Sequence, residues 1–236
     1  MHPLDNPIWK ALTTSQSHFA RTGELARRFP NEVTRLGGFP EPTLECYDSL
    51  ATILDDVNAT GIFLEAAPQP PAGWEILSDA LLFQMILENG EAAAASQPQR
   101  PAPQFVELTA GDAPEMLTLA ELTKPGPFGL RTGELGTYLG IRESGRLIAM
   151  AGERLHVPGF TEISAVCTHP DHTGRGYAAA LMTELAQRIR GRGETPFLHV
   201  REVNTRAISL YEHLGYRKRV LLHVAVLRKP PEEAAA

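Results

Sequence analysis

One short stretch, residues 161–177 (TEISAVCTHPDHTGRGY), constrains the fold of this chain more than any other. Its first part is apolar and rich in β-branched residues, which predicts a buried strand. The strand must end before Pro170, because proline cannot continue a ladder of backbone hydrogen bonds. Two glycines then mark a turn, and apolar residues recur at helical spacing from Ala178 to Ile189. The predicted order is therefore strand, glycine turn and helix.

This turn has the properties of an anion-binding site. A helix N-terminus presents unpaired N–H groups and partial positive charge, and Gly174 and Gly176 would let a pyrophosphate approach the backbone without meeting a Cβ atom. A Walker A loop is excluded, because Tyr177 follows Gly176 where that motif needs lysine. The dinucleotide fingerprint is weakened but stays open, since Ala179 stands where its third glycine is usual and alanine is sometimes accepted there.

A third pattern fits the turn better. Residues 173–178 (TGRGYA) resemble the Arg/Gln-x-x-Gly-x-Gly/Ala signature of the GCN5-related N-acetyltransferase (GNAT) family, although Thr173 stands where Arg or Gln is usual. A second block, residues 204–216 (NTRAISLYEHLGY), resembles the C-terminal signature of the same family. The two blocks occur in the family's order, with a helix and the strand-like segment 196–200 between them. The resemblance covers roughly residues 105–228 and is closest to the FR47-like branch.

The resemblance implies a fold and a reaction. The fold would be an α/β class fold with a mixed sheet, the acyl-CoA N-acyltransferase fold, in which four antiparallel strands lead to the cofactor turn. The reaction would transfer acetyl from acetyl-CoA to a primary amine of a small molecule or amino acid, by direct attack on the thioester and without a metal. No cluster of His, Cys and Asp has zinc spacing. A protein-lysine acetyltransferase and a non-catalytic acyl-CoA-binding or sensory protein stay open as alternatives.

Two groups of residues are implied by the resemblance to bind coenzyme A. Backbone groups at the end of the strand would pair with the pantetheine arm and polarise the thioester carbonyl, and the glycine turn would hold the pyrophosphate. Asn204 would contact the pantetheine or only cap its own helix. Cys167 has no neighbouring His partner and is expected to pack beside the cofactor rather than act as a nucleophile. The predicted cofactor-binding residues are Val166, Cys167, Thr168, Thr173, Gly174, Arg175, Gly176, Tyr177, Ala178 and Asn204.

Two residues are candidates for catalysis. By resemblance to the histone acetyltransferase branch, Glu162 occupies the position of a catalytic glutamate and would accept the proton of an ammonium group whose ordinary pKa is about 10.4. The competing interpretation is a structural carboxylate paired with arginine or backbone. Tyr211 matches the family's general acid, which protonates the departing thiolate, and its competing interpretation is a core aromatic residue.

The amino-acid composition is that of a globular protein. With 43% hydrophobic and 21% charged residues, the 236-residue chain has ordinary globular usage, and its net charge of −6 gives no overall basic field to attract nucleic acid or anionic lipid. Its two cysteines, Cys46 and Cys167, are too few for a disulfide framework and favour a reducing compartment. Neither a signal segment nor a membrane-spanning run is evident, so we expect a cytoplasmic protein. A homodimer stays open.

The chain is expected to divide near its middle. Residues 1–95 predict an N-terminal α/β domain, with a helix around residues 8–19 and no phosphate turn. One interpretation of this domain is a degenerate copy of the GNAT fold. We expect it to have a structural role or to shape the acceptor site. Residues 96–104 are rich in Ala and Pro and predict a linker, and residues 105–236 would form the N-acetyltransferase domain. Its loop residues Lys124, Phe128, Arg131 and Glu134 are candidates for acceptor selection or ordinary exposed positions.

Overall fold

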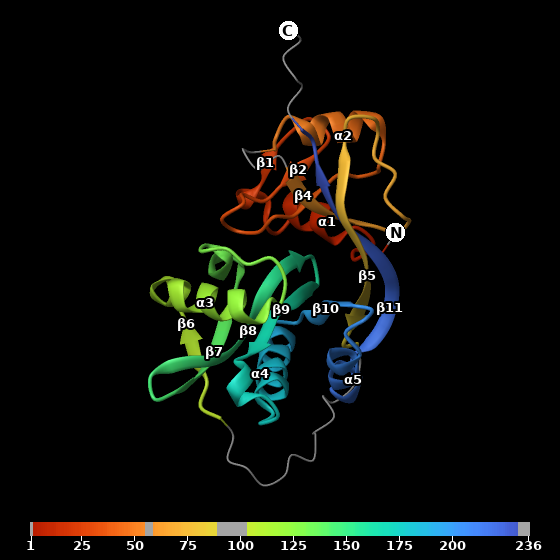
Figure 1. Ribbon diagram of the computed structural model, residues 1–236. Helices are drawn as coiled ribbons and strands as arrows, with labels where there is room; N and C mark the ends of the chain where they lie inside the picture. Colours follow the sequence, from red (N-terminus) through yellow and green to blue (C-terminus); the bar gives the residue numbers. More distant parts are fainter. Residues whose placement is uncertain (1, 55–58, 89–102, 231–236) are drawn as a thin grey trace. The chain divides into compact units, whose positions relative to one another are not determined.

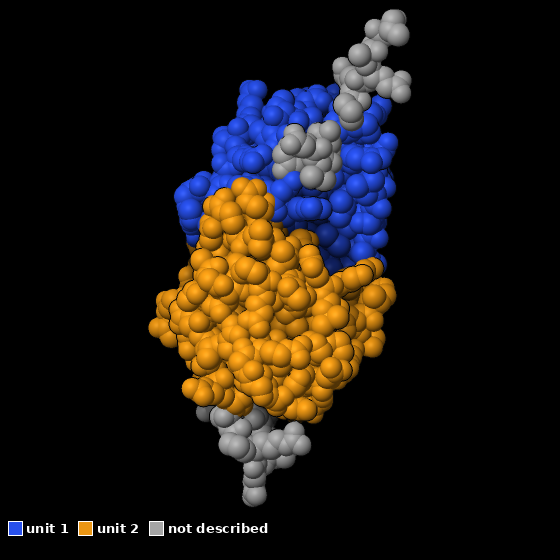
Figure 2. Space-filling model, turned by 60° about the vertical axis from the view of Figure 1, so that its left-hand side comes forward, with its two compact units in different colours: residues 1–31, 35–82, 221–236 blue, residues 32–34, 83–220 orange. Residues whose placement is uncertain are grey.

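The computed structural model describes residues 2–54, 59–88 and 103–230, which fall into two compact units. Unit 1 consists of residues 1–31, 35–82 and 221–236, and unit 2 consists of residues 32–34 and 83–220 (Figure 2). Residues 221–236 thus group with unit 1, whereas the sequence analysis placed them with the C-terminal domain. Most of the expected linker at 96–104 lies outside the described residues.

Unit 2 is built on a mixed sheet. Strands β6 to β9 are antiparallel neighbours in chain order, as the family resemblance implied, and β10 adds to β9 in parallel (Figure 1). The end of β5 lies beside β10, and the start of β11 lies beside β5. The strands are β5 (Glu75–Ile86), β6 (Val106–Leu108), β7 (Tyr138–Glu143), β8 (Arg146–Val157), β9 (Phe160–Thr168), β10 (Thr195–Arg201) and β11 (Arg217–Arg228). Of β5 and β11, only residues 83–86 and 217–220 belong to unit 2.

Helices cover both faces of the sheet in unit 2. On one face, α4 (Tyr177–Gly191) and α5 (Thr205–His213) pack on a core that includes Ala149 and Ala151 of β8. On the other face, α3 (Ala113–Thr123) packs on a core that includes Met150, because alternate residues of a strand point to opposite faces. Burial of each large apolar side chain stabilises such layers by about 1.5–3 kcal/mol. In α4 these are Leu181, Met182, Leu185 and Ile189.

Local signals explain where these helices and strands begin and end. Short 3-10 helices lie before α3 (η2, Ala110–Asp112), before β7 (η3, Thr132–Leu135) and after β9 (η4, Pro170–His172). Asn204 caps α5 through its side chain, and Gly215, at φ +94°, follows the helix end. Ser144 and Gly145 both have positive φ and form the two-residue hairpin turn between β7 and β8.

Unit 1 has short elements around an aromatic core. Its helices are α1 (Pro7–Thr13), η1 (Ser17–Phe19) and α2 (Leu44–Ala51), and its strands are β1 (Arg21–Thr22), β2 (Arg27–Arg28), β3 (Gly37–Gly38) and β4 (Ala59–Leu64). Strand β4 pairs with β11 from His223 to Arg228, and this pairing explains why the C-terminal residues belong to unit 1. Phe39, Tyr47 and Trp74 form the centre of its core.

The first helix is shorter than the sequence pattern suggested. Helix α1 ends at Thr13, and Phe19 lies in the separate 3-10 helix η1. The hydroxyl of Thr13 donates to the carbonyl of Trp9, and that of Thr14 to the carbonyl of Lys10. Such side-chain bonds to the backbone compete with helix continuation. Within the described ranges, no helix is long and apolar enough to cross a membrane.

Candidate functional site

Strands β9 and β10 pair over only the first part of β9. Their parallel pairing runs from Thr195 opposite Phe160 to Phe197 opposite Glu162. Further along β9, among the residues that the structure describes, pairing continues with β8 alone. The backbone at Val166, Cys167 and Thr168, three predicted cofactor-binding positions, therefore has no strand partner on the β10 side.

A bulge in β9 accompanies this divergence. Met150 and Gly152 of β8 are two residues apart, whereas their partners Cys167 and Ser164 are three apart, so β9 carries one extra residue. Ala165 within it has a left-handed φ of +54°, which is uncommon for a residue with a Cβ atom. A bulge bends its strand and increases its twist. It thereby helps to separate the end of β9 from β10.

Cys167 is buried on the face of the sheet that α3 covers. It belongs to the core formed with α3, and burial raises the pKa of its thiol to about 11. A thiol with this pKa is protonated near neutral pH and is a poor nucleophile. Val166, its neighbour, instead packs against the core on the α4 face.

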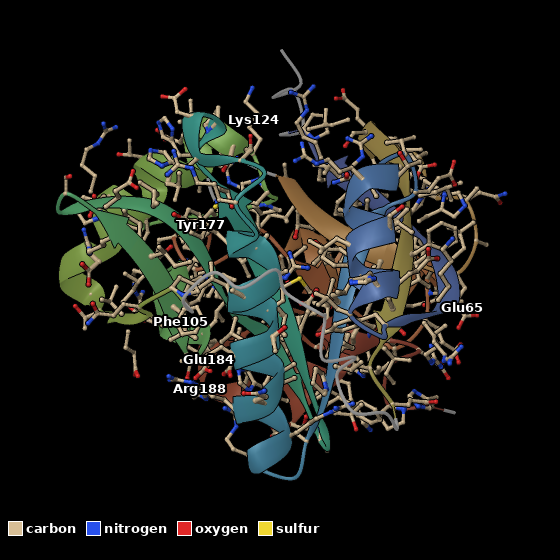
Figure 3. The ribbon with its side chains drawn as sticks, turned by 90° about the horizontal axis from the view of Figure 1, so that it is seen from below. Glu65, Phe105, Lys124, Tyr177, Glu184 and Arg188 are labelled. Carbon is tan, nitrogen blue, oxygen red and sulfur yellow. The ribbon has the colours of Figure 1, made fainter. Side chains whose placement is uncertain are left out.

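The turn after β9 leaves open space in front of α4. Gly174 and Gly176 have φ of +75° and +81°, and a Cβ atom built on either would meet no atom within 4 Å. Gly176 is the N-cap residue of α4, and Tyr177 and Ala178 are the first helical residues (Figure 3). Thr173 holds the turn, because its hydroxyl donates to the carbonyl of Pro170 at 3.1 Å. The turn therefore has the space and the N–H groups that an anion needs.

Arg175 lies exposed between these glycines. Its Nη1 atom is 3.1 Å from Oε1 of Glu143, and both side chains are nearly half exposed. A surface pair of this kind contributes little to stability, since solvent screens it. The guanidinium is therefore available to a phosphate at low energetic cost.

Tyr211 packs in the same core as residues at the end of β9 and at the start of α4. Tyr211 is 9% exposed and shares this core with Val166 and Tyr177. Its ring centroid is 6.2 Å from that of Tyr216. Burial raises the pKa of Tyr211 to about 12, so its phenol is neutral near pH 7 and able to donate a proton. Asn204 accepts a hydrogen bond from the Ala207 backbone N–H at 3.2 Å, which accounts for capping of α5.

Glu162 is buried and carries two strong partners. Arg154 donates from Nε to Oε2 at 2.9 Å and from Nη2 to Oε1 at 2.6 Å. His199 Nδ1 lies 2.7 Å from Oε1. Burial alone would raise the pKa of Glu162, but Arg154 and His199 outweigh it and lower the pKa to about 2. The carboxylate is thus ionised and paired with an arginine, and its role as a general base stays a prediction.

The pair extends into a chain of buried polar groups that sequence reasoning missed. His199 Nε2 lies 3.1 Å from Nε2 of Gln84, whose Oε1 accepts a hydrogen bond from Arg219 at 2.9 Å. His199 therefore bridges Glu162 and Gln84 through its two ring nitrogens. The sequence signal that could have indicated this pair is the opposite charge of Arg154 and Glu162 on two consecutive predicted strands. The competing interpretation of Glu162 named an arginine partner by residue type alone, and the structure identifies this partner as Arg154.

The structure places each of the candidates for acceptor selection, and Lys124 is the left-handed C-cap residue of α3, with φ of +50°. Arg131 donates to both oxygens of Glu134 at 2.7 Å and to Glu32 at 3.2 Å. Phe128 packs edge-on against Tyr138, with ring centroids 5.9 Å apart. Their part in acceptor selection stays a prediction. In the described part of the chain, no group of three or more His, Cys, Asp or Glu side chains is arranged to hold a metal ion.

Comparisons with known proteins bear on this site. The model of the FR47-like protein family matches residues 138–224. A crystal structure titled "Putative Acetyltransferase from the GNAT family", from Novosphingobium aromaticivorans, is 35% identical with a TM-score of 0.87, and the alignment covers 98% of this chain and 100% of that one. A GCN5-related N-acetyltransferase from Kribbella flavida is 18% identical with a TM-score of 0.58, over 97% of this chain and 98% of that one, and shows likeness of fold alone.

A curated relative matches over a shorter stretch. The N-alpha-acetyltransferase RimI of Mycobacterium tuberculosis is 34% identical over 84 residues. These are 34% of this chain and 52% of the relative, so the match spans about half of the relative's length.

Proposed function

Because the chain belongs to the GNAT family of acetyltransferases, we propose that it transfers the acetyl group of acetyl-CoA to the primary amine of a small molecule. One observation carries the proposal. The β9–β10 pairing stops at Glu162 and Phe197, and the strand end that it leaves leads through η4 into the glycine turn of α4. An extended backbone with free hydrogen-bonding groups and a helix N-terminus therefore follow one another along the chain.

This order suits the two halves of coenzyme A. The pantetheine arm is extended and carries amides, so it can bind along the backbone of Val166 and Thr168 as an added strand would. The pyrophosphate would bind the N–H groups at Gly174 and Gly176, where no Cβ atom stands and the helix dipole favours negative charge. The exposed guanidinium of Arg175 would add a charged hydrogen bond to phosphate.

The proposed reaction is a direct acyl transfer. The amine nitrogen attacks the thioester carbonyl carbon, a C–N bond forms, and the C–S bond breaks to release a thiolate. Tyr211 would give its phenolic proton to that thiolate. Its raised pKa of about 12 keeps the phenol protonated before the C–S bond breaks. Backbone N–H groups at the end of β9 would stabilise the negative charge on the carbonyl oxygen.

A second group must accept the proton that the amine loses. We keep Glu162 as the proposed base, but its oxygens are held by Arg154 and His199 and its pKa is lowered. A carboxylate with a low pKa accepts a proton weakly. Because Arg154 and His199 occupy its oxygens, the proton would reach Glu162 through water, and not by direct contact with the amine.

The acceptor is proposed as a small amine, with a protein N-terminus as the second candidate. The second candidate rests on one observation, the 34% identity over 84 residues to a relative whose name denotes N-alpha-acetylation. An acetyltransferase acting on protein lysine and a non-catalytic acyl-CoA-binding protein are the further alternatives.

The test uses the full chain with acetyl-CoA and three classes of acceptor. These are a panel of small primary amines, peptides with a free N-terminus and no lysine, and N-terminally blocked peptides with one lysine. Release of coenzyme A thiol gives the rate, and mass spectrometry of the acceptor shows an acetyl group on the product. Turnover confined to small amines supports the proposal. Turnover confined to either peptide class overturns the acceptor assignment, and acetyl-CoA binding without any turnover supports the non-catalytic alternative.

A further inference from the structure

Unit 1 contains a pocket that the proposed reaction does not use. Its volume is about 570 Å³, and every residue lining it belongs to unit 1. That volume lies within the range of small-molecule sites. The apolar part of its lining includes Phe39, Ile62 and Leu64.

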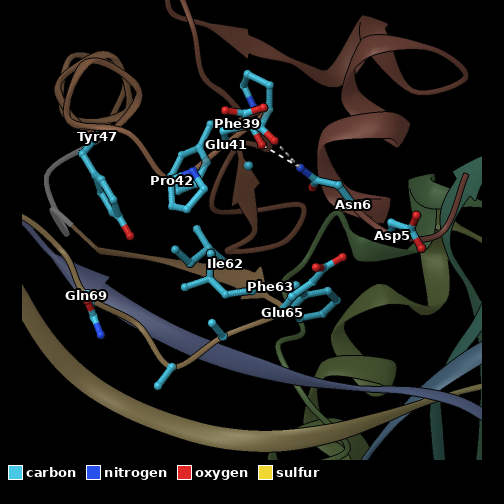
Figure 4. A pocket seen from close by; sticks show the side chains of 15 residues that line it. Asp5, Asn6, Phe39, Glu41, Pro42, Tyr47, Ile62, Phe63, Glu65 and Gln69 are labelled. Atoms are coloured by element: carbon cyan, nitrogen blue, oxygen red, sulfur yellow. Dashed lines mark hydrogen bonds between the residues drawn. The ribbon is translucent and has the colours of Figure 1, made fainter. Parts of the chain in front are cut away.

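A buried hydroxyl group faces this pocket. Tyr47 lines it, is 1% exposed, and its Oη atom has no hydrogen-bond partner in the described part of the chain. Figure 4 shows the Tyr47 side chain extending into the pocket with its hydroxyl foremost. A buried polar atom without a partner is costly, commonly about 1–3 kcal/mol, so a ligand that supplies the partner is favoured.

All the charged residues that line the pocket are acidic. Asp5, Glu41 and Glu65 line the pocket, and its lining contains no Lys, Arg or His. Glu41 and Glu65 form no ion pair with any residue in the described ranges. Figure 4 shows Asp5, Asn6 and Glu65 on the side of the pocket away from Tyr47, and Glu41 beside Phe39 and Pro42. Asn6 uses its Nδ2 group to donate to the carbonyl of Phe39 at 2.7 Å, and this bond helps to fix that wall.

We propose that this pocket binds a small organic ammonium ion with a polar group at its other end. The carboxylate of Glu65 would hold the ammonium group, Asp5 and Glu41 would add negative charge to the lining, and the apolar body would lie along Ile62. The polar end would exchange a hydrogen bond with Tyr47 Oη. The site is separate from the acetyl-CoA site proposed above, and its test needs no acyl donor.

Tyramine is the probe, because it carries an ammonium group at one end and a phenol at the other. Phenethylamine lacks the phenol, and 4-hydroxyphenylacetate replaces the cation with an anion. Calorimetry on the full chain, without acetyl-CoA, gives each affinity. The two tryptophans, Trp9 and Trp74, both lie in unit 1, and the Trp74 ring centroid is 5.6 Å from that of Tyr47. In a Trp9→Phe background, a change in Trp74 fluorescence therefore locates binding at this pocket.

We expect tyramine to bind at least about threefold more tightly than phenethylamine, and 4-hydroxyphenylacetate at least about tenfold more weakly than tyramine. Glu65→Gln should weaken tyramine binding about tenfold, since it removes a charge-assisted contact. Tyr47→Phe keeps the ring and should abolish the difference between tyramine and phenethylamine. Glu24→Gln is the matched control, because Glu24 is an exposed acid of unit 1 outside the pocket lining, and it should leave all affinities unchanged.

Three results would overturn the proposal. One is equal binding of the anionic probe, and another is tyramine binding that Glu65→Gln and Tyr47→Phe do not alter. The third is tyramine binding by calorimetry without a change in Trp74 fluorescence, which would place the amine elsewhere. None of these results depends on turnover, so failure here is distinguishable from failure of the proposed acetyltransferase reaction.

Discussion

Glu162 and Arg154 form a buried two-point ion pair, with N–O distances of 2.9 and 2.6 Å and side chains 1% and 9% exposed. Glu162 is also the last residue of β9 that pairs with β10, and it contacts His199 of β10. Arg154, Glu162 and His199 thus join β8, β9 and β10 at the point where the sheet opens. A network at this place fixes the strand end that is proposed to hold the pantetheine arm.

Glu162→Gln is expected to destabilise the protein by about 3–5 kcal/mol, because it removes the carboxylate charge that is paired with the buried Arg154. Urea denaturation measures the free energy of unfolding. Arg154→Met and the double variant complete a double-mutant cycle. The double variant should lose clearly less than the sum of the two single losses. Additive losses would mean that the pair contributes no coupling energy.

The same pair makes stability depend on acidic pH. The pKa of Glu162 is lowered in the folded state from 4.5 to about 2, so the folded protein binds fewer protons there than the unfolded chain. The stabilisation is therefore fully present above pH 4.5 and is lost as the pH falls from 4.5 towards about 2. Unfolding free energies of wild type and Glu162→Gln, measured across this window, should converge as the pH falls. A constant difference down to the lowest pH would contradict the assignment.

Local sequence signals predicted the conformation of the glycine turn, and long-range contacts explain what was missed. Gly174 and Gly176 have positive φ values that glycine tolerates, so the turn follows from residue type. The bulge at Ala165 has no such signal, because an alanine reaches positive φ only under constraint from neighbouring strands. The same holds for the pairing of β11 with β4, which links residues far apart in the chain.

In the candidate site, too, the contacts between distant residues could not be predicted from local sequence signals. Helical spacing placed Tyr211 on a helix, but only packing shows that it shares a core with Val166 and Tyr177. The position of Glu162 in β9 follows from the sequence, whereas its burial against Arg154 and His199 depends on the register of three strands. Residue identities therefore gave candidates, and tertiary contacts decide how each can act.

Tyr211→Phe is expected to lower kcat about 100-fold or more, because it removes the proposed proton donor to the thiolate while keeping the ring. Acetyl-CoA affinity, measured by calorimetry, should change little. Tyr216→Phe is the matched control, since Tyr216 is buried in the same core and its hydroxyl has no hydrogen-bond partner within the described residues. That variant should keep near wild-type turnover. Equal loss in both variants would point to packing, and no loss in Tyr211→Phe would remove Tyr211 from the mechanism.

Gly176→Val is expected to weaken acetyl-CoA binding at least about tenfold, a loss of about 1.4 kcal/mol. The new side chain would stand in the open space before α4 that is proposed to hold the pyrophosphate. It would also force a β-branched residue into a left-handed conformation, which costs roughly 1–2 kcal/mol of stability by itself. A loss of affinity alone would not separate these two effects.

Gly193→Val separates them. Gly193 follows the C-terminal end of α4, has a φ of +79° against +81° at Gly176, and likewise has no atom within 4 Å of an added Cβ. The two variants should therefore lose similar stability in urea denaturation, because they carry the same backbone strain. Only Gly176→Val should lose acetyl-CoA affinity, since only its side chain lies at the helix N-terminus. If both variants bound acetyl-CoA equally well, the pyrophosphate would have to bind elsewhere and the glycine turn would lose its proposed role.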